Sequence, residues 1–191
     1  IHGGDIYRNH VSLDFSVNMN PLGIPESVVG ALHSAVDQCG TYPDIHSQEL
    51  KAAVGKMLGI PADRLIFGNG ASELFLAVVH AFKPKRVVIP APSFYGYEHA
   101  AKAVKADISY CYLKEEQDFS LTESVFADLQ EDVDLLFLAN PNNPTGRSVE
   151  RGNLIKILTH CRENNIIVVL DECFIEFCAA EEAVSAIDLL S

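Results

Sequence analysis

Residues 135–146 read LLFLANPNNPTG, an apolar run followed at once by the heptad NPNNPTG at residues 140–146. A short run without polar interruption is typical of a strand buried on both faces, as strands of parallel sheets are. In the heptad, the prolines stiffen the turn and the asparagines offer hydrogen bonds. We therefore interpret the segment as a buried strand that ends in a functional loop.

Apolar runs of this kind recur along the chain, and most end in polar or glycine-rich turns. We interpret five of them as strands: RLIFGNG (64–70), RVVIPAP (86–92), DISYCYL (107–113), DLLFLANP (134–141) and IIVVLDE (166–172). Helical patterns alternate with these runs, at residues 72–82, 97–104, 121–129 and 151–164. Such alternation predicts an α/β fold of three αβα layers, with a mostly parallel sheet between helices.

The first sixty residues have a different pattern from the rest of the chain. An extended polar start is followed by a predicted helix at residues 26–39, which Pro25 opens, and by another at residues 47–58. We expect residues 1–45 to form an arm with a helix, and residues 46–191 to form the sheet domain.

The composition narrows the possible partners. The net charge is −12, and lysine and arginine form no cluster with aromatic residues, which argues against nucleic acid as a partner. No apolar run approaches the roughly 20 residues of a membrane-spanning helix, and the first ten residues are too polar for a signal peptide. We interpret the chain as cytoplasmic, with no membrane partner.

The cysteines do not have the paired spacing of a metal site. Their number is odd, so we expect five free thiols and no metal: Cys39, Cys111, Cys161, Cys173 and Cys178.

Unusual residues follow four of the predicted strands. The segment GNGASE (68–73) opens a helix near Ser72, where glycines and free N–H groups suit a phosphate, although an ordinary serine cap would read the same way. Either Phe94 or Tyr95 could cover a planar ligand, and Asp171 places a carboxylate where a strand ends. Ligands of open α/β sheets bind at the carboxyl ends of strands.

These features together would hold a flat, phosphorylated nitrogen heterocycle. Pyridoxal phosphate is such a ligand, because a carboxylate keeps its pyridine nitrogen protonated and so makes the ring an electron sink. The GNGASE segment lacks the lysine of a nucleotide phosphate loop and the glycine spacing of a dinucleotide fingerprint, so a nucleotide is the weaker interpretation.

With these motifs the chain resembles the fold-type I pyridoxal-phosphate enzymes, that is, the aspartate aminotransferase superfamily with its class I and II aminotransferases. The resemblance covers essentially the whole chain and is most specific in NPNNPTG (140–146) and VVLDECFIEF (168–177). It implies that the sheet domain is the large, cofactor-binding domain of that fold, and that the arm belongs to the small domain and the dimer contact.

The resemblance also implies roles for single residues. Gly70, Ala71 and Ser72 match the residues that bind the cofactor phosphate, Phe94 matches the residue that stacks on the ring, and Asn143 matches the residue that bonds the ring hydroxyl oxygen.

Two more matches concern the pyridine nitrogen and the neighbouring subunit. Asp171 matches the residue that pairs with the pyridine nitrogen. Tyr42, in the stretch TYPD, is similar to the tyrosine that reaches the cofactor phosphate of a neighbouring subunit, which implies a homodimer.

Within the superfamily, the chain is most similar to histidinol-phosphate aminotransferases and, among their relatives, to the L-threonine-O-3-phosphate decarboxylases of cobalamin biosynthesis. The stretch HGG, with LDFSVNMNPLG at residues 13–23, resembles the decarboxylase arm, so that His2, Gly3 and Asn18 would bind the substrate phosphate. Asp5 departs from the asparagine usual in that arm. Phe174 replaces the tyrosine usual in aminotransferases, which favours the decarboxylases.

The lysine that forms the Schiff base in this superfamily is missing. It is expected downstream of Asp171, but the last lysine of the sequence is Lys156. We therefore expect a chain that is incomplete at its carboxyl end, contains no catalytic residue of its own and is inactive alone.

Three functions follow from this reading. The first is decarboxylation of L-threonine O-3-phosphate, a small phosphorylated amino acid, to aminopropanol phosphate. The second is transamination by a histidinol-phosphate or other class I or II aminotransferase. The third is a non-catalytic module that retains the cofactor-binding residues and lacks the lysine.

Overall fold

The computed structural model describes residues 3–179 and 185–189, and it divides the chain into two compact units, residues 1–65 and 66–191. Among the described residues, no helix is both long enough and apolar enough to cross a bilayer.

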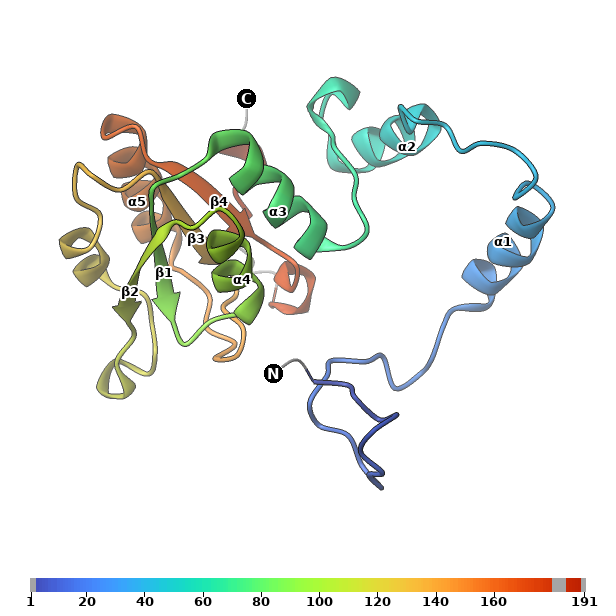
Figure 1. Cartoon of the computed structure of the whole chain (residues 1–191), viewed down its shortest axis with the longest axis horizontal. Coiled ribbons are helices and arrows are strands. Elements are labelled where there is room, and N and C mark those ends of the chain that lie inside the picture. Colours follow the sequence, from blue (N-terminus) through green and yellow to red (C-terminus); the bar gives the residue numbers. More distant parts are fainter. Residues whose placement is uncertain (1–2, 180–184, 190–191) are drawn as a thin grey trace. The chain divides into compact units, whose positions relative to one another are not determined.

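The second unit is built on a four-stranded parallel sheet (Figure 1). Its strands are β1 (Arg86–Ala91), β2 (Asp107–Tyr112), β3 (Leu135–Ala139) and β4 (Ile167–Asp171). Their order across the sheet is β2-β1-β3-β4, and every pair is parallel. The prediction of a mostly parallel sheet is therefore confirmed for the described residues.

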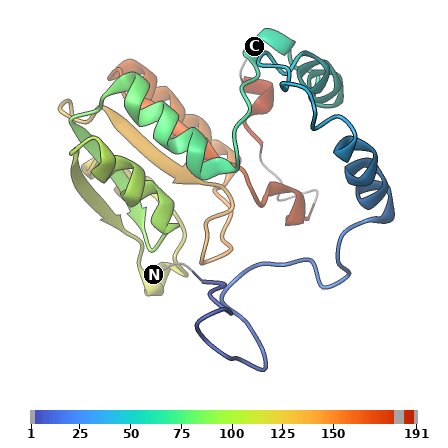
Figure 2. The same ribbon diagram turned by 45° about the vertical axis from the view of Figure 1, so that its right-hand side comes forward.

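Helices cover both faces of this sheet. On one face α3 (Ala71–Phe82) and α4 (Tyr95–Ala103) lie side by side, as Figures 1 and 2 show, and α5 (Arg151–Glu163) covers the other face. Short 3-10 turns complete the unit, at Glu115–Gln117, Glu123–Ala127, Ile175–Phe177 and Ile187–Leu189. The three αβα layers are as predicted from the alternation of strands and helices.

The core consists of two apolar clusters, one on each face of the sheet. Side chains of a strand alternate between its faces, so Val87 and Ile89 pack toward α3 and α4 while Val88 packs toward α5. All of β3 is buried, which is why the run 135–139 carries no polar residue.

Two predicted elements differ in the structure. Residues 64–70 do not form a strand, and Ile66 is 78% exposed. A strand requires a hydrogen-bonded neighbour, and neither edge strand, β2 or β4, pairs with this segment in the described sheet. The helix predicted at residues 121–129 is the 3-10 turn Glu123–Ala127, although its apolar spacing does place Leu121, Val125 and Leu129 in the core.

The first unit contains α1 (Glu26–Val36), α2 (Gln48–Leu58) and the 3-10 turn Ala62–Arg64. No residue of α1 is buried. At the start of the chain, the Gly4 N–H donates to Ser16 Oγ at 2.8 Å, which closes the arm into a loop. The division into functional domains at residue 45 stays a prediction.

Candidate functional site

The chain reverses its direction across the sheet between β1 and β3. From β1 it moves outward to β2, then returns to form β3 on the other side of β1. At such a switch point the loops after the two central strands diverge, and a crevice opens beyond their carboxyl ends. The loops after β1 and β3 and the start of α3 supply this edge.

The start of α3 leaves its N–H groups without a side-chain cap. Gly70 stands at the N-cap position with φ 76° and ψ 168°, a backbone conformation that only glycine adopts readily. A Cβ at this position would meet no atom within 4 Å, so the space beside it is open. The Glu73 carboxylate accepts a hydrogen bond from the Asn69 N–H and steadies the loop instead. An uncapped helix start with open space in front suits an anion.

The asparagines of NPNNPTG have distinct tasks. Asn140 is fully buried, and its Oδ1 accepts a hydrogen bond of 2.8 Å from the Val149 N–H. Asn142 Nδ2 donates to the Pro92 carbonyl oxygen at 3.0 Å and to Thr145 Oγ1 at 2.9 Å. These two side chains therefore hold the loop in shape and join it to the loop after β1.

Asn143 is different, because its side chain makes no hydrogen bond to any described residue. It is half-buried and adjacent to the tightly held Asn142. A polar side chain in an ordered loop with its amide still unpaired is available to bind a ligand. This is the asparagine for which the sequence predicted a cofactor contact.

Asp171 ends β4 with hydrogen bonds to all three of its oxygens. Its carbonyl oxygen accepts from the Asn140 N–H at 2.8 Å, which places the end of β4 next to the start of the NPNNPTG loop. Its Oδ1 accepts from the Cys173 N–H at 2.9 Å. Its Oδ2 accepts from the hydroxyl group of Tyr97 at 2.7 Å.

The groups around Asp171 are held in their protonated forms. Burial, followed by the charge of Asp171 and the hydrogen bond to it, raises the pKa of the Tyr97 hydroxyl. Burial and the charge of Asp171 likewise raise the pKa of the Cys173 thiol. Tyr97 therefore acts as a donor to the carboxylate at neutral pH.

An aromatic cluster underlies this edge of the sheet and comprises Phe75, Phe94, Tyr97 and Phe137. The Tyr97 ring stacks on Phe137 with centroids 5.1 Å apart and meets Phe75 edge-on at the same separation. Phe94 contacts Tyr97 edge-on at 5.7 Å. Because Phe75 lies in the second turn of α3, the cluster links the start of that helix to Phe94 and Asp171.

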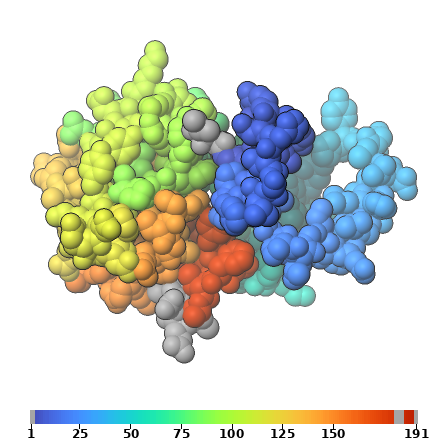
Figure 3. All heavy atoms as spheres, turned by 90° about the horizontal axis from the view of Figure 1, so that it is seen from below, coloured from blue at the N-terminus to red at the C-terminus, as the bar shows by residue number. Residues whose placement is uncertain are grey.

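The structure thus brings six predicted site residues to one edge of the second unit: Gly70, Ala71, Ser72, Phe94, Asn143 and Asp171. Figure 3 shows the segments that follow β3 and β4, in orange and red, side by side on this face. A hydrogen-bond contact between Ser148 and Cys178, 3.3 Å apart, joins the same two segments.

The other predicted residues lie in the first unit or outside the described residues. Tyr42 is 98% exposed, in the turn between α1 and α2. Gly3 and Asn18 belong to the arm, where Gly3 packs against Ser16 so closely that a Cβ would collide with it. His2 lies outside the described residues. The roles expected for these residues stay predictions.

Lys156, the last lysine of the sequence, lies away from this edge of the sheet. It lies on α5, on the opposite face of the sheet from α3 and α4, and forms an ion pair with Glu123. Its hydrogen bond and charge interaction with Glu123 raise the pKa of its amine. Lys156 is therefore not the lysine that the site would need.

Tyr97 is the residue of this edge that the sequence analysis did not identify. One signal was present, since Tyr97 follows Phe94 by three residues and so shares its side of the helix. Its partner Asp171 is 74 residues away, and no local pattern connects the two.

Comparisons with known proteins show which family has this sequence and this architecture. The model of the class I and II aminotransferases matches residues 11–191. Threonine-phosphate decarboxylase of Salmonella typhimurium is 39% identical over 165 residues, which cover 86% of this chain and 45% of that protein. Histidinol-phosphate aminotransferase of Bacillus subtilis is 32% identical over 176 residues, covering 91% of this chain and 48% of that protein.

A solved structure gives the same result for the fold. Histidinol-phosphate aminotransferase from Clostridium acetobutylicum superposes with a TM-score of 0.75 and 30% identity, covering 85% of this chain and 48% of that one. The chain thus spans about half the length of the curated relatives it matches. By its family model and its fold, the chain belongs to the class I and II aminotransferases, a family of pyridoxal-phosphate-dependent, fold-type I enzymes.

Proposed function

We propose that the second unit supplies most of the pyridoxal-phosphate site of an enzyme that decarboxylates L-threonine O-3-phosphate to aminopropanol phosphate, a reaction of cobalamin biosynthesis. One observation carries the cofactor part of this proposal. The uncapped start of α3, the unpaired amide of Asn143 and the carboxylate of Asp171 lie at one edge of one sheet.

The residues present fit the cofactor group by group. The N–H groups of Ala71 and Ser72, with the hydroxyl of Ser72, would hold the phosphate at the positive end of α3. Asn143 would donate to the ring oxygen. Asp171 would hold a proton on the pyridine nitrogen, and Phe94 would cover the ring and limit the access of water.

When bound, the cofactor ring supplies an electron sink for the bond that breaks at the substrate Cα. The chain itself would orient the ring through Asp171 and Asn143, and would hold the phosphate at the N–H groups of Ala71 and Ser72. The lysine of the reaction would come from sequence beyond these residues, so we propose that residues 1–191 alone do not turn over substrate.

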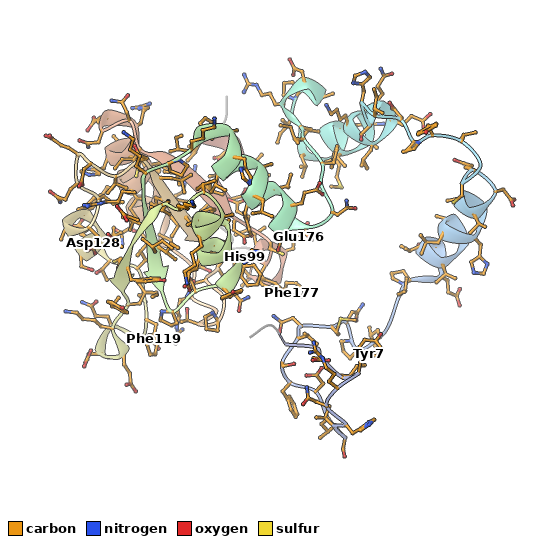
Figure 4. All side chains as sticks on the ribbon, in the orientation of Figure 1. Tyr7, His99, Phe119, Asp128, Glu176 and Phe177 are labelled. Atoms are coloured by element: carbon orange, nitrogen blue, oxygen red, sulfur yellow. The ribbon has the colours of Figure 1, made fainter. Side chains whose placement is uncertain are left out.

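Two features support a decarboxylase. The threonine-phosphate decarboxylase of Salmonella typhimurium is 39% identical to this chain, whereas the histidinol-phosphate aminotransferase of Bacillus subtilis is 32% identical. Phe174, three residues after Asp171, has no hydroxyl group with which to bond the ring oxygen. Its ring lies 6.1 Å from that of Phe177, which is labelled in Figure 4 in the segment that follows β4.

We also propose the substrate contacts and the assembly that the family resemblance implies. His2, Gly3 and Asn18 of the arm would bind the substrate phosphate. The exposure of the Tyr42 ring fits a residue that reaches the cofactor phosphate of a second copy, and we therefore propose a cytoplasmic homodimer.

A histidinol-phosphate aminotransferase is the second candidate. It rests on the Clostridium structure, which is 30% identical with a TM-score of 0.75, and on the Bacillus relative at 32%. In that reaction Cα–H breaks and an amino group passes to a 2-oxo acid.

The deciding experiment uses the full-length protein loaded with pyridoxal phosphate. Carbon dioxide release from L-threonine phosphate is measured without any oxo acid, beside glutamate formation from histidinol phosphate and 2-oxoglutarate. We expect carbon dioxide and no glutamate. Glutamate without carbon dioxide would instead establish the aminotransferase. Neither product, with cofactor bound, would reject both substrates.

A further inference from the structure

The contact between Tyr97 and Asp171 joins two parts of the fold that are distant in sequence. Tyr97 lies in the first turn of α4 and Asp171 at the end of β4, and the phenol oxygen stands 2.7 Å from Asp171 Oδ2. A distance of 2.7 Å is that of a strong hydrogen bond from a hydroxyl group to a carboxylate.

Tyr97 is rigidly held. It is 1% exposed, and its ring lies among Phe75, Phe94 and Phe137 of the aromatic cluster. With the ring fixed by packing on several sides, the hydroxyl group has a fixed position. Burial raises the pKa of this hydroxyl, so it remains a donor throughout the physiological pH range.

The Asp171 carboxylate is fixed in its turn by two donors from different elements. The Cys173 N–H bonds Oδ1 and the Tyr97 hydroxyl bonds Oδ2. One hydrogen bond leaves a carboxylate free to rotate about its Cβ–Cγ bond, whereas a donor on each oxygen determines its plane. Of the two, only Tyr97 can be changed without altering the backbone.

We propose that Tyr97 is a positioning residue, whose hydroxyl group sets the orientation of the Asp171 carboxylate toward the pyridine nitrogen of the cofactor. This inference rests on the proposed function, in which Asp171 meets that nitrogen. Tyr97 itself does not touch the reacting atoms. It acts through Asp171, and its ring supports Phe94 from beneath.

The replacement Tyr97→Phe separates these two tasks, because it removes the hydroxyl and keeps the ring. Tyr112→Phe is the matched control, since Tyr112 is 72% exposed on the edge strand β2 and contacts only Tyr110 among described aromatic rings. Asp171→Ala tests the proposed function itself. All three variants are made in the full-length protein.

Two quantities are measured, the dissociation constant for pyridoxal phosphate and the visible absorption band of the bound cofactor. We expect Tyr97→Phe to weaken binding by roughly two- to tenfold, because an Asp171 carboxylate that is free to rotate must be immobilised when the cofactor binds, and to alter the band. Tyr112→Phe should leave both unchanged. Asp171→Ala should weaken binding more than Tyr97→Phe and change the band in the same direction.

The outcomes separate the two claims. If Asp171→Ala changes both quantities and Tyr97→Phe changes neither, the positioning role is wrong and the proposed function stands. If Asp171→Ala changes neither, the proposed role of Asp171 is wrong and the positioning role with it. Circular dichroism verifies that each variant is folded.

Should Tyr97→Phe not fold, the same measurements are made on Tyr97→His, which keeps a ring N–H donor. The absorption band of Tyr97→His should be closer to that of the unaltered protein than the band of Asp171→Ala is. A band matching that of Asp171→Ala would overturn the inference.

Discussion

The side-chain amide of Asn142 donates to the carbonyl oxygen of Pro92 at 3.0 Å and so ties the loop after β3 to the loop after β1. The next residue, Asn143, makes no side-chain hydrogen bond within the described structure. Two neighbouring asparagines therefore differ: Asn142 joins the two loops, and the side chain of Asn143 is left available for the cofactor contact that we propose.

This difference predicts that two alanine substitutions affect different properties, one the stability and the other the binding of the cofactor. Asn142→Ala leaves the carbonyl of Pro92 unpaired and should lower the free energy of unfolding by about 1–3 kcal/mol. Asn143→Ala should leave it unchanged within about 0.5 kcal/mol and weaken pyridoxal-phosphate binding instead. Urea unfolding and cofactor titration of both variants make the comparison. Equal destabilisation by the two would contradict the assignment.

The proposed binding of the cofactor phosphate at the start of α3 can be tested at Ser72. The exposed side chain of Ser72 has no hydrogen-bond partner in the described residues. Ser72→Ala should therefore not change stability, but should weaken pyridoxal-phosphate binding roughly tenfold, because one hydrogen bond to the charged phosphate is lost. Ser120→Ala, in the loop after β2, is the control and should bind normally. If pyridoxal without phosphate is weakened to the same degree, Ser72 does not hold the phosphate.

The two ends of α5 predict opposite effects for two glutamates. Glu150 caps the helix start, accepting hydrogen bonds from the Gly152 and Asn153 N–H groups at 2.9 and 3.1 Å. Glu150→Ala should cost about 1 kcal/mol of stability, as the loss of an N-cap does. Glu163→Ala removes a negative charge from the last turn and should stabilise by a few tenths of a kcal/mol. Thermal unfolding at low salt measures both, and stabilisation by Glu150→Ala would refute the cap.

The buried thiol of Cys161 predicts a loss of stability at alkaline pH. Burial raises the pKa of this thiol to about 11, from an ordinary value of 9.0. As the pH rises above the unfolded value, the unfolded chain loses this proton and the folded chain keeps it. Ionisation thus favours unfolding, and the thiol contributes a loss of roughly 1.4 kcal/mol per pH unit until the folded pKa is passed.

The test compares slopes rather than absolute stabilities, because Cys161→Ala also leaves a cavity. The free energy of unfolding is measured in urea between pH 8 and pH 10.5, by roughly half-unit steps chosen around the two pKa values. Cys161→Ala should show the shallower decline. The exposed Cys39 provides the control, and Cys39→Ala should keep the slope of the unaltered protein. Identical slopes for all three proteins would exclude the effect.

The sheet could be predicted from the sequence where burial and pairing coincide. The runs containing β1, β2, β3 and β4 are apolar because helices or loops cover them, and each has a paired neighbour. Residues 64–70 are apolar as well but have no partner strand in the described sheet, and an apolar run by itself does not reveal pairing.

The site was predictable only to the level of segments. Strand ends located Asn143 and Asp171 at one edge, because parallel strands share a direction, whereas Ser72 lies there through the start of α3 and not through the strand predicted at residues 64–70. The division of labour among the asparagines depends on which backbone groups lie nearby, and that is fixed by tertiary structure. The link from Tyr97 to Asp171 spans 74 residues and has no local signature.

The strand order has a consequence for how the protein is made. During synthesis β1 emerges first, β2 pairs with it, β3 joins the free side of β1, and β4 joins β3. Each new strand thus finds its neighbour already outside the ribosome, and the sheet can grow without exposing an unpaired apolar strand for long. Residues 65–67 are the exception, since this apolar segment is synthesised before β1 and pairs with no strand of the described sheet.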